Sequence, residues 1–165
     1  MATTFAGSDL RSVLGRLPTG VVVVTGLVDG APVGVALNSF TSVSLDPPLV
    51  SFCLARTSTT WPVLRRAQRW AISVLGEGHE DVCRRFATRG ADRFAGLDTA
   101  PAPGGAPVLA GSTAWLDCRL SAVHEAGDHD LVLAEVLDLG SGDRHGTDNG
   151  PLVFHQGRYL GLGAA

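Results

Sequence analysis

The sequence predicts a mainly β protein, an antiparallel barrel with two or three short helices. Segments of strand length follow one another through tight turns, and residues 21–27 and 31–37 flank a Val-Asp-Gly turn that is typical of a hairpin. A longer hairpin is predicted by residues 114–125 and 130–139, which are joined at Gly-Asp-His. With 165 residues the chain can build one self-sufficient core, so we expect a single domain over residues 1–165.

The helices are predicted by spacing and by capping residues. Apolar side chains recur at helical spacing over residues 8–17, and Pro18 closes this segment. These side chains are Leu10, Val13, Leu14 and Leu17. A second helix is expected from the candidate N-caps at 58–60 through Ala67, and a third over 77–87.

The remaining segments are expected to be strands and loops. Two further strands are predicted over 48–55 and 70–75, and a last hairpin over 152–155 and 158–162. Residues 88–111 are rich in Gly, Ala and Pro and predict a long loop, which in a compact domain is usually a lid, a binding segment or a mobile excursion. The acidic, Gly-rich residues 140–150 predict another loop.

Composition limits the classes of function. Hydrophobic residues make up 45% of the chain and charged residues 18%, which indicates a globular protein, and a net charge of −3 gives no basic field for nucleic acid or membranes. All thirteen basic residues are arginine, and the chain has no lysine. Phosphate-loop nucleotidases and Schiff-base enzymes both need a lysine, so these two classes are excluded. We expect a cytoplasmic protein, since no secretory signal or bilayer-spanning run is evident and Cys53, Cys83 and Cys118 are widely spaced.

Two of the predicted strands carry bulky side chains on one face and small ones on the other. The small sets are Gly34, Ala36 and Asn38 on the first strand, and Ser51, Cys53 and Ala55 on the second. Because side chains alternate between the faces of a sheet, each small set lets a flat group approach the backbone closely. Packing of this face against another strand or a partner subunit is the alternative explanation.

Hydroxyl and amide side chains follow both of these strands. Residues 38–42, Asn-Ser-Phe-Thr-Ser, can hydrogen-bond the polar edge of a heterocycle, or they form an ordinary turn between strands. Residues 58–62, Ser-Thr-Thr-Trp-Pro, offer hydroxyls and free N–H groups at a predicted helix start, which suits a phosphate, or they are only caps.

Several common catalytic motifs are missing from the sequence. No Gly-x-Gly-x-x-Gly links a strand to a helix, and no Gly-x-Ser-x-Gly is present. His124 and His129 are five residues apart, whereas a helical zinc motif needs a spacing of four, so no metal site is expected.

Taken together, the chain resembles the flavin reductase family along nearly its whole length. The matching segments are Phe5, Leu10-Arg11, residues 17–25, 34–44 and 47–52, Ser58 with Thr60-Trp61, residues 85–87, 92–94 and 127–129, and the closing 151–154 with 157–159. The segment 34–44 and Gly-Asp-His at 127–129 are the most specific of these.

The resemblance implies an FMN-binding split β-barrel, antiparallel and Greek-key-like, that forms a homodimer with its sites near the interface. It implies flavin-ring contacts at Asn38, Ser39, Phe40 and Thr41, next to the small-faced Gly34, Ala36, Ser51 and Cys53. It implies phosphate contacts around Ser58, Thr59, Thr60 and Trp61, with Arg85 and Phe86 on the following helix. Arg93 and Phe94 are expected to border the site, as are Asp128 and Tyr159. His129 is the expected catalytic residue and would orient the nicotinamide. Where a relative has lysine on its phosphate-facing helix, this chain must use Arg84 or Arg85.

The function that the resemblance implies is NAD(P)H-dependent reduction of FMN or FAD, with transfer of the reduced flavin to a partner monooxygenase. This chemistry is positional and needs no nucleophile–base pair, in keeping with the sequence. Acidic neighbours of His129 favour NADH over NADPH. Two alternatives stay open: a flavin-binding split barrel with another redox role, such as an oxidase relative, electron carrier or sensor, and a non-enzymatic β-barrel module.

Overall fold

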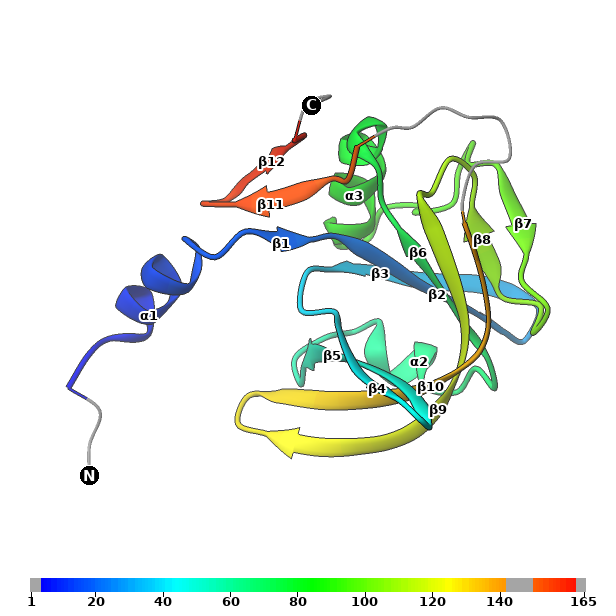
Figure 1. The fold of residues 1–165 in the computed structure, drawn as a ribbon, viewed down its shortest axis with the longest axis horizontal. Coiled ribbons are helices and arrows are strands. Elements are labelled where there is room, and N and C mark those ends of the chain that lie inside the picture. The colour runs from blue at the N-terminus through cyan, green and yellow to red at the C-terminus, as the bar shows by residue number, and fades with distance from the viewer. Residues whose placement is uncertain (1–3, 142–149, 163–165) are drawn as a thin grey trace.

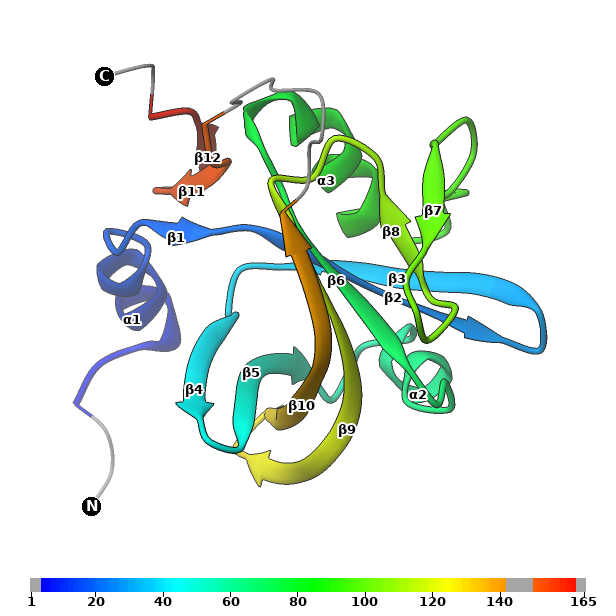
Figure 2. The same cartoon turned by 45° about the vertical axis from the view of Figure 1, so that its right-hand side comes forward.

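A computed structural model describes residues 4–141 and 150–162 of the chain. At its centre is a seven-stranded antiparallel sheet in the order β3-β2-β6-β9-β10-β5-β4, which curls round on itself in both views (Figures 1 and 2). Its strands are β2 (Val22–Val28), β3 (Ala31–Leu37), β4 (Thr41–Leu45), β5 (Pro48–Ala55), β6 (Trp70–Val74), β9 (Ala114–Ala126) and β10 (His129–Ser141). The prediction of a mainly β, antiparallel fold is confirmed.

The barrel is split between β3 and β4. These two strands form opposite edges of the seven-stranded sheet, yet they are consecutive in the chain and are joined by residues 38–40. Each edge strand has a row of backbone groups that has no strand partner in this sheet. The polar segment that the sequence singled out therefore crosses the opening of the barrel.

Two apolar cores lie on either side of β2. Val22 and Val24 pack inside the barrel with Trp70 and Phe52, whereas Val21 and Val23 belong to an outer cluster. That outer cluster contains Phe86 and Cys83 of helix α3 (Glu80–Ala87). An uninterrupted run of valines is what a strand buried on both faces requires.

A smaller sheet ends the chain beside the barrel. Strands β11 (Val153–His155) and β12 (Arg158–Leu160) form the expected last hairpin, and β11 pairs with the two-residue strand β1 (Thr19–Gly20). Helix α1 (Gly7–Leu14) precedes β1 and lies at the edge of the molecule, away from the seven-stranded sheet, in both views (Figures 1 and 2).

Four local predictions need correction. Helix α2 spans only Trp61–Leu64 and does not reach Ala67. Residues 77–87 form a 3-10 turn, η1 (Glu77–His79), before α3. The expected loop at 88–111 contains a small hairpin, β7 (Thr99–Pro101) with β8 (Pro107–Leu109), and residues 41–45 form the unpredicted strand β4. Most of the predicted loop at 140–150 lies outside the described residues, and β10 continues to Ser141.

Across residues 4–141 and 150–162, none of the helices has the length and apolar character needed to cross a bilayer.

Candidate functional site

The segment between β3 and β4 is fastened across the opening to strand β5. The Ser39 hydroxyl accepts a hydrogen bond from the Cys53 N–H (2.9 Å) and donates one to the Cys53 carbonyl (3.1 Å). Asn38 donates from its amide to the Thr19 hydroxyl at 3.1 Å, which ties the same segment to β1. These contacts fix the backbone of the segment and bring the polar end of β3 next to Cys53.

Arg93 connects the backbone of β3 to the start of α2. Its Nη1 donates to the Gly34 carbonyl at 2.6 Å and to the Thr60 hydroxyl at 2.7 Å. Partial burial lowers the pKa of this guanidinium. Both contacts use the same nitrogen, so Nε and Nη2, which also carry N–H groups, can still donate to a ligand.

Ser58 lies two residues before Thr60, the N-cap of helix α2. Its hydroxyl accepts the N–H groups of Thr60 (3.3 Å) and Trp61 (3.1 Å), while Thr59 is exposed. The Trp61 side chain is buried and its indole N–H donates to Asp130 at 2.8 Å. Of the hydroxyls in this segment, Ser58 and Thr60 have protein partners and Thr59 faces solvent.

The small face of β3 is closed at one end and open at the other. A Cβ at Gly34 would lie 2.8 Å from the Phe86 ring, so the small face packs here against helix α3, and not against a strand or a partner subunit as the alternative explanation expected. Two residues further on, Ala36 and Asn38 line a pocket of about 100 Å³ together with Cys83 and Tyr159. A flat ligand can therefore meet this face only from Ala36 onward.

Phe86 has no exposed surface and packs edge-on against Phe94, with ring centroids 5.1 Å apart. In this structure it supports Gly34 from behind and has no surface for a ligand. Ser51 is likewise buried, on β5. These two expected contact residues contribute to the framework of the site.

The Gly-Asp-His sequence forms the tip of the β9–β10 hairpin, as expected. His129 Nδ1 lies 2.7 Å from Asp128 Oδ1, and this contact holds the pKa of the carboxyl below its usual range. The Asp128 carbonyl accepts the Arg56 N–H at 2.9 Å, and His129 pairs with Ala55 at the end of β5. The hairpin tip thus lies beside the segment that leads to Ser58.

Arg84 and Arg85 make their contacts elsewhere than at Ser58 and Thr60. Arg84 pairs with Glu80 at 2.6 Å and lies over the Tyr159 ring, 5.1 Å from its centroid. Arg85 donates to the Ala95 carbonyl at 2.6 Å. The arginine that contacts the expected phosphate segment is Arg93.

Cys83 and Tyr159 form a contact that the sequence did not indicate. The thiol donates to the phenol oxygen at 3.1 Å, and burial raises the pKa of both groups. The pair joins α3 to β12 at the pocket beside Ala36. Asp130 and Thr19 were also missed, because their roles depend on partners far away in the chain.

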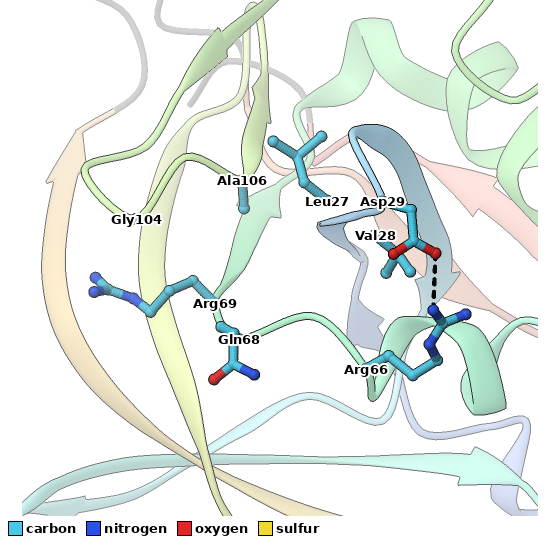
Figure 3. Close-up of a pocket in the computed structure, with 8 residues that line it drawn as sticks. All are labelled: Leu27, Val28, Asp29, Arg66, Gln68, Arg69, Gly104 and Ala106. Carbon is cyan, nitrogen blue, oxygen red and sulfur yellow. Dashed lines mark hydrogen bonds and ion pairs between the residues drawn. The ribbon is translucent and has the colours of Figure 1, made fainter.

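A separate polar pocket of about 280 Å³ lies at the other end of β2 (Figure 3). There Arg66 pairs with Asp29 at 2.8 Å, and Arg69 points away from that pair toward Asp117. None of the residues predicted for the functional site lines it. The described residues contain no group of three or more His, Cys, Asp or Glu arranged to hold a metal ion.

Comparison with known proteins places this geometry in a family. Residues 14–163 match the family described as flavin reductase like domain. The chain is 41% identical, over 92% of its length and 76% of the relative's, to the reductase subunit HsaB of a flavin-dependent monooxygenase from Rhodococcus jostii. It is 43% identical to a flavin reductase from Pseudomonas putida, with 93% and 89% of the two chains covered. An NADH:FAD oxidoreductase from Streptomyces globisporus, solved with NAD and FAD fragments, shares 36% identity and a TM-score of 0.87 over 98% of both chains. The chain belongs to the flavin reductase family.

Proposed function

We infer that this chain is an NADH-dependent flavin reductase that reduces FMN or FAD and supplies the reduced flavin to a separate monooxygenase. The observation that carries the proposal is the split of the barrel. Ser39 hydrogen-bonds there to Cys53, and Arg93 joins Gly34 of the edge strand β3 to Thr60, within a family match that covers residues 14–163. The relatives named above include a monooxygenase reductase subunit and an NADH:FAD oxidoreductase, which supports the partner and the donor.

The residues at the split fit a flavin phosphate. Arg93 is partly buried and has N–H groups left to donate. It contacts Thr60, and the preceding residue in the chain, Thr59, has an exposed hydroxyl. Since α2 has only four residues, we assign the binding of phosphate to these side chains and not to the helix dipole. Bound flavin supplies the acceptor for a hydride.

The protein's part in the reaction is to place two rings against each other. Ser39 holds the segment from 38 to 40 through its paired hydrogen bonds with Cys53, so the surface next to the ring is rigid. Backbone N–H groups in this segment would stabilise negative charge on the reduced ring. Ala36 lets the ring approach the sheet closely.

His129 orients the nicotinamide in this proposal. The contact with Asp128 fixes the imidazole ring, and the partly exposed His129 lies at the tip of the hairpin beside the end of β5. The Asp128 carboxylate repels the additional phosphate of NADPH, which favours NADH.

Purification followed by a visible spectrum and a donor–acceptor assay tests the proposal. NADH oxidation is followed separately with FMN, FAD and riboflavin. Turnover with at least one flavin is the expected result. If the protein binds flavin but does not oxidise NADH, it has another redox role. If it binds neither flavin nor NADH, it is a non-enzymatic module.

We also propose a homodimer in the cytoplasm. Large apolar side chains are exposed on several elements, including Leu45 of β4, which is 90% exposed, and Leu139 of β10 at 65%. A second copy of the chain would cover them. The free thiols of Cys53, Cys83 and Cys118 are compatible with a reducing compartment.

A further inference from the structure

Helix α1 presents its polar face, not its apolar face, to the rest of its own chain. Ser8, Arg11, Ser12 and Gly15 follow one another at three- and four-residue spacing and so form one stripe along the helix. All four line a groove of about 650 Å³, together with Arg16. The apolar stripe, Leu10, Val13, Leu14 and Leu17, is exposed. An ordinary surface helix has the opposite orientation, with apolar residues turned inward.

The other wall of the groove is the C-terminal hairpin. Phe154 and Gln156 line it, and the backbone N–H of Gln156 donates to the Gly15 carbonyl at 2.8 Å, which fastens the hairpin to the end of α1. Figures 1 and 2 show α1 beside β1, with β11 and β12 on the far side of β1. The volume of the groove falls within the range of small-molecule sites, roughly 300–1,000 Å³.

Two guanidinium groups on this groove are not engaged in hydrogen bonds or close ion pairs among the described residues. Neither Arg11 nor Arg16 has a side-chain hydrogen bond or close ion pair with any residue in the described part of the chain. Arginine prefers planar, bidentate contacts with phosphate or carboxylate. With the Ser8 and Ser12 hydroxyls beside them, the two arginines form a basic surface on a chain whose net charge is −3.

The groove adjoins the pocket beside Ala36, because Phe154 lines both. Arg11 lies close enough to Asp128 for its charge to contribute to the lowered pKa of that carboxyl. Asp128 in turn contacts His129. Since Phe154 is shared, a ligand whose ring lies in the pocket beside Ala36 can extend past it into the groove, toward Arg11 and Arg16.

We propose that this groove binds the adenosine diphosphate half of a dinucleotide, with Arg11 and Arg16 at the diphosphate and the Phe154 ring as an apolar wall for the base. The inference rests on the proposed function, because it takes the dinucleotide from that reaction. NADH and FAD share this half, whereas FMN and reduced nicotinamide mononucleotide lack it. The sequence motifs gave Arg11 and Arg16 no role.

The test uses the variants Arg11→Gln and Arg16→Gln and their combination. Arg66→Gln is the matched control, because Arg66 is an exposed arginine that pairs with Asp29 away from the groove. If the groove holds NADH, the KM for NADH with FMN as acceptor rises about tenfold for each arginine removed, while the KM for reduced nicotinamide mononucleotide is unchanged. If it holds FAD, the KM for FAD rises when reduced nicotinamide mononucleotide is the donor, and the KM for FMN stays constant.

Either result supports the groove and identifies its ligand. The proposal is overturned if the double variant has the same KM for NADH and for FAD as the wild type. It is also overturned if the KM values for reduced nicotinamide mononucleotide and FMN rise as much as those for NADH and FAD. Calorimetric titration with ADP alone gives an independent readout, with binding to the wild type and to Arg66→Gln but not to the double variant. A wild type that binds ADP yet reduces no flavin would contradict the proposed function and not the groove.

Discussion

Gly34 is a residue at which strand β3 packs directly against helix α3. A Cβ there would lie 2.8 Å from the Phe86 ring, 3.0 Å from the Val24 carbonyl and 3.1 Å from the Thr25 methyl. Phe86 is fully buried and cannot swing out into solvent. The absence of a side chain at this position is therefore a packing requirement of the outer core, and only secondarily a feature of the site.

The variant Gly34→Ala should consequently lose stability. Overpacking a buried contact of this kind costs roughly 1–3 kcal/mol, which chemical denaturation will measure. Gly7→Ala is the matched control, since a Cβ at Gly7 meets nothing within 4 Å. Equal stability of Gly34→Ala and the wild type would show that α3 does not pack on β3 as described.

Replacement of His129 by alanine should raise the KM for NADH and lower kcat to a smaller extent. The reason is that an orienting contact made before hydride transfer contributes mainly to binding. Steady-state kinetics with FMN as acceptor will show the change, and His124→Ala, which alters another histidine on the same hairpin, should have no effect. An unchanged KM would remove His129 from this role.

Asp128 gives a prediction about donor choice and pH. The pKa of its carboxyl is lowered, mainly by the hydrogen bond with His129, so the group stays charged throughout the neutral range and becomes neutral only in acid. Asp128→Asn should raise the ratio of kcat/KM for NADPH to that for NADH severalfold near neutral pH. In the wild type the preference for NADH should weaken only as the pH falls through the lowered pKa. A ratio unaffected by the substitution would rule out charge as the cause.

At the scale of elements, long alternating segments were predictable and short ones were not. The hairpins β2–β3 and β9–β10 follow from apolar alternation and turn residues, and the structure confirms both. Helix α2 ends early because the Leu64 carbonyl accepts the indole N–H of Trp70 at 3.0 Å, a contact that local sequence does not reveal. Strand β4 was missed because its polar residues Thr41, Ser42 and Ser44 are those of an exposed edge.

In the candidate site, too, local sequence features were predictable and contacts between distant residues were not. The polar segment at 38–41, the caps at 58–60 and the Gly-Asp-His turn could be identified from composition and family resemblance. The roles of Arg93 and Phe86 could not, because each depends on a contact with Gly34 of β3, more than 50 residues earlier in the chain. Arg93 contacts Thr60 from 33 residues away. Side-chain direction at such distances is decided by tertiary packing.

Asp117 joins three elements through one buried carboxylate. It has no exposed surface, and it accepts hydrogen bonds from Arg69, which precedes β6, and from the Gly104 N–H between β7 and β8. Asp117→Ala should cost about 3 kcal/mol, the low end for breaking a buried pair, since Arg69 is 31% exposed and can regain water.

Thermal or urea unfolding will measure this loss. Asp29→Ala breaks the exposed pair with Arg66 and is the matched control, with an expected change of about 0–1 kcal/mol. Losses of equal size in the two variants would contradict the buried role of Asp117.

At the scale of the whole molecule, the exposure of helix α1 gives a prediction about association. The helix has eight residues, none of them buried, and an isolated helix of this length is marginal in water. Its apolar stripe includes Val13 and Leu14, which are 65% and 58% exposed, and it points away from its own barrel because the polar stripe faces the groove. A second copy of the chain that covers this stripe would stabilise both the helix and the groove behind it.

Light scattering coupled to size-exclusion chromatography should therefore give twice the chain mass of 17.1 kDa. The double variant Val13→Gln with Leu14→Gln should shift the protein toward the monomer, because burying the two amide side chains in the interface removes them from water at a cost in free energy. Ser12→Gln changes the opposite stripe of the same helix and should leave the mass unchanged. A wild type that stays monomeric at every concentration, or a double variant that dimerises as well as the wild type, would show that α1 does not contribute to the subunit interface.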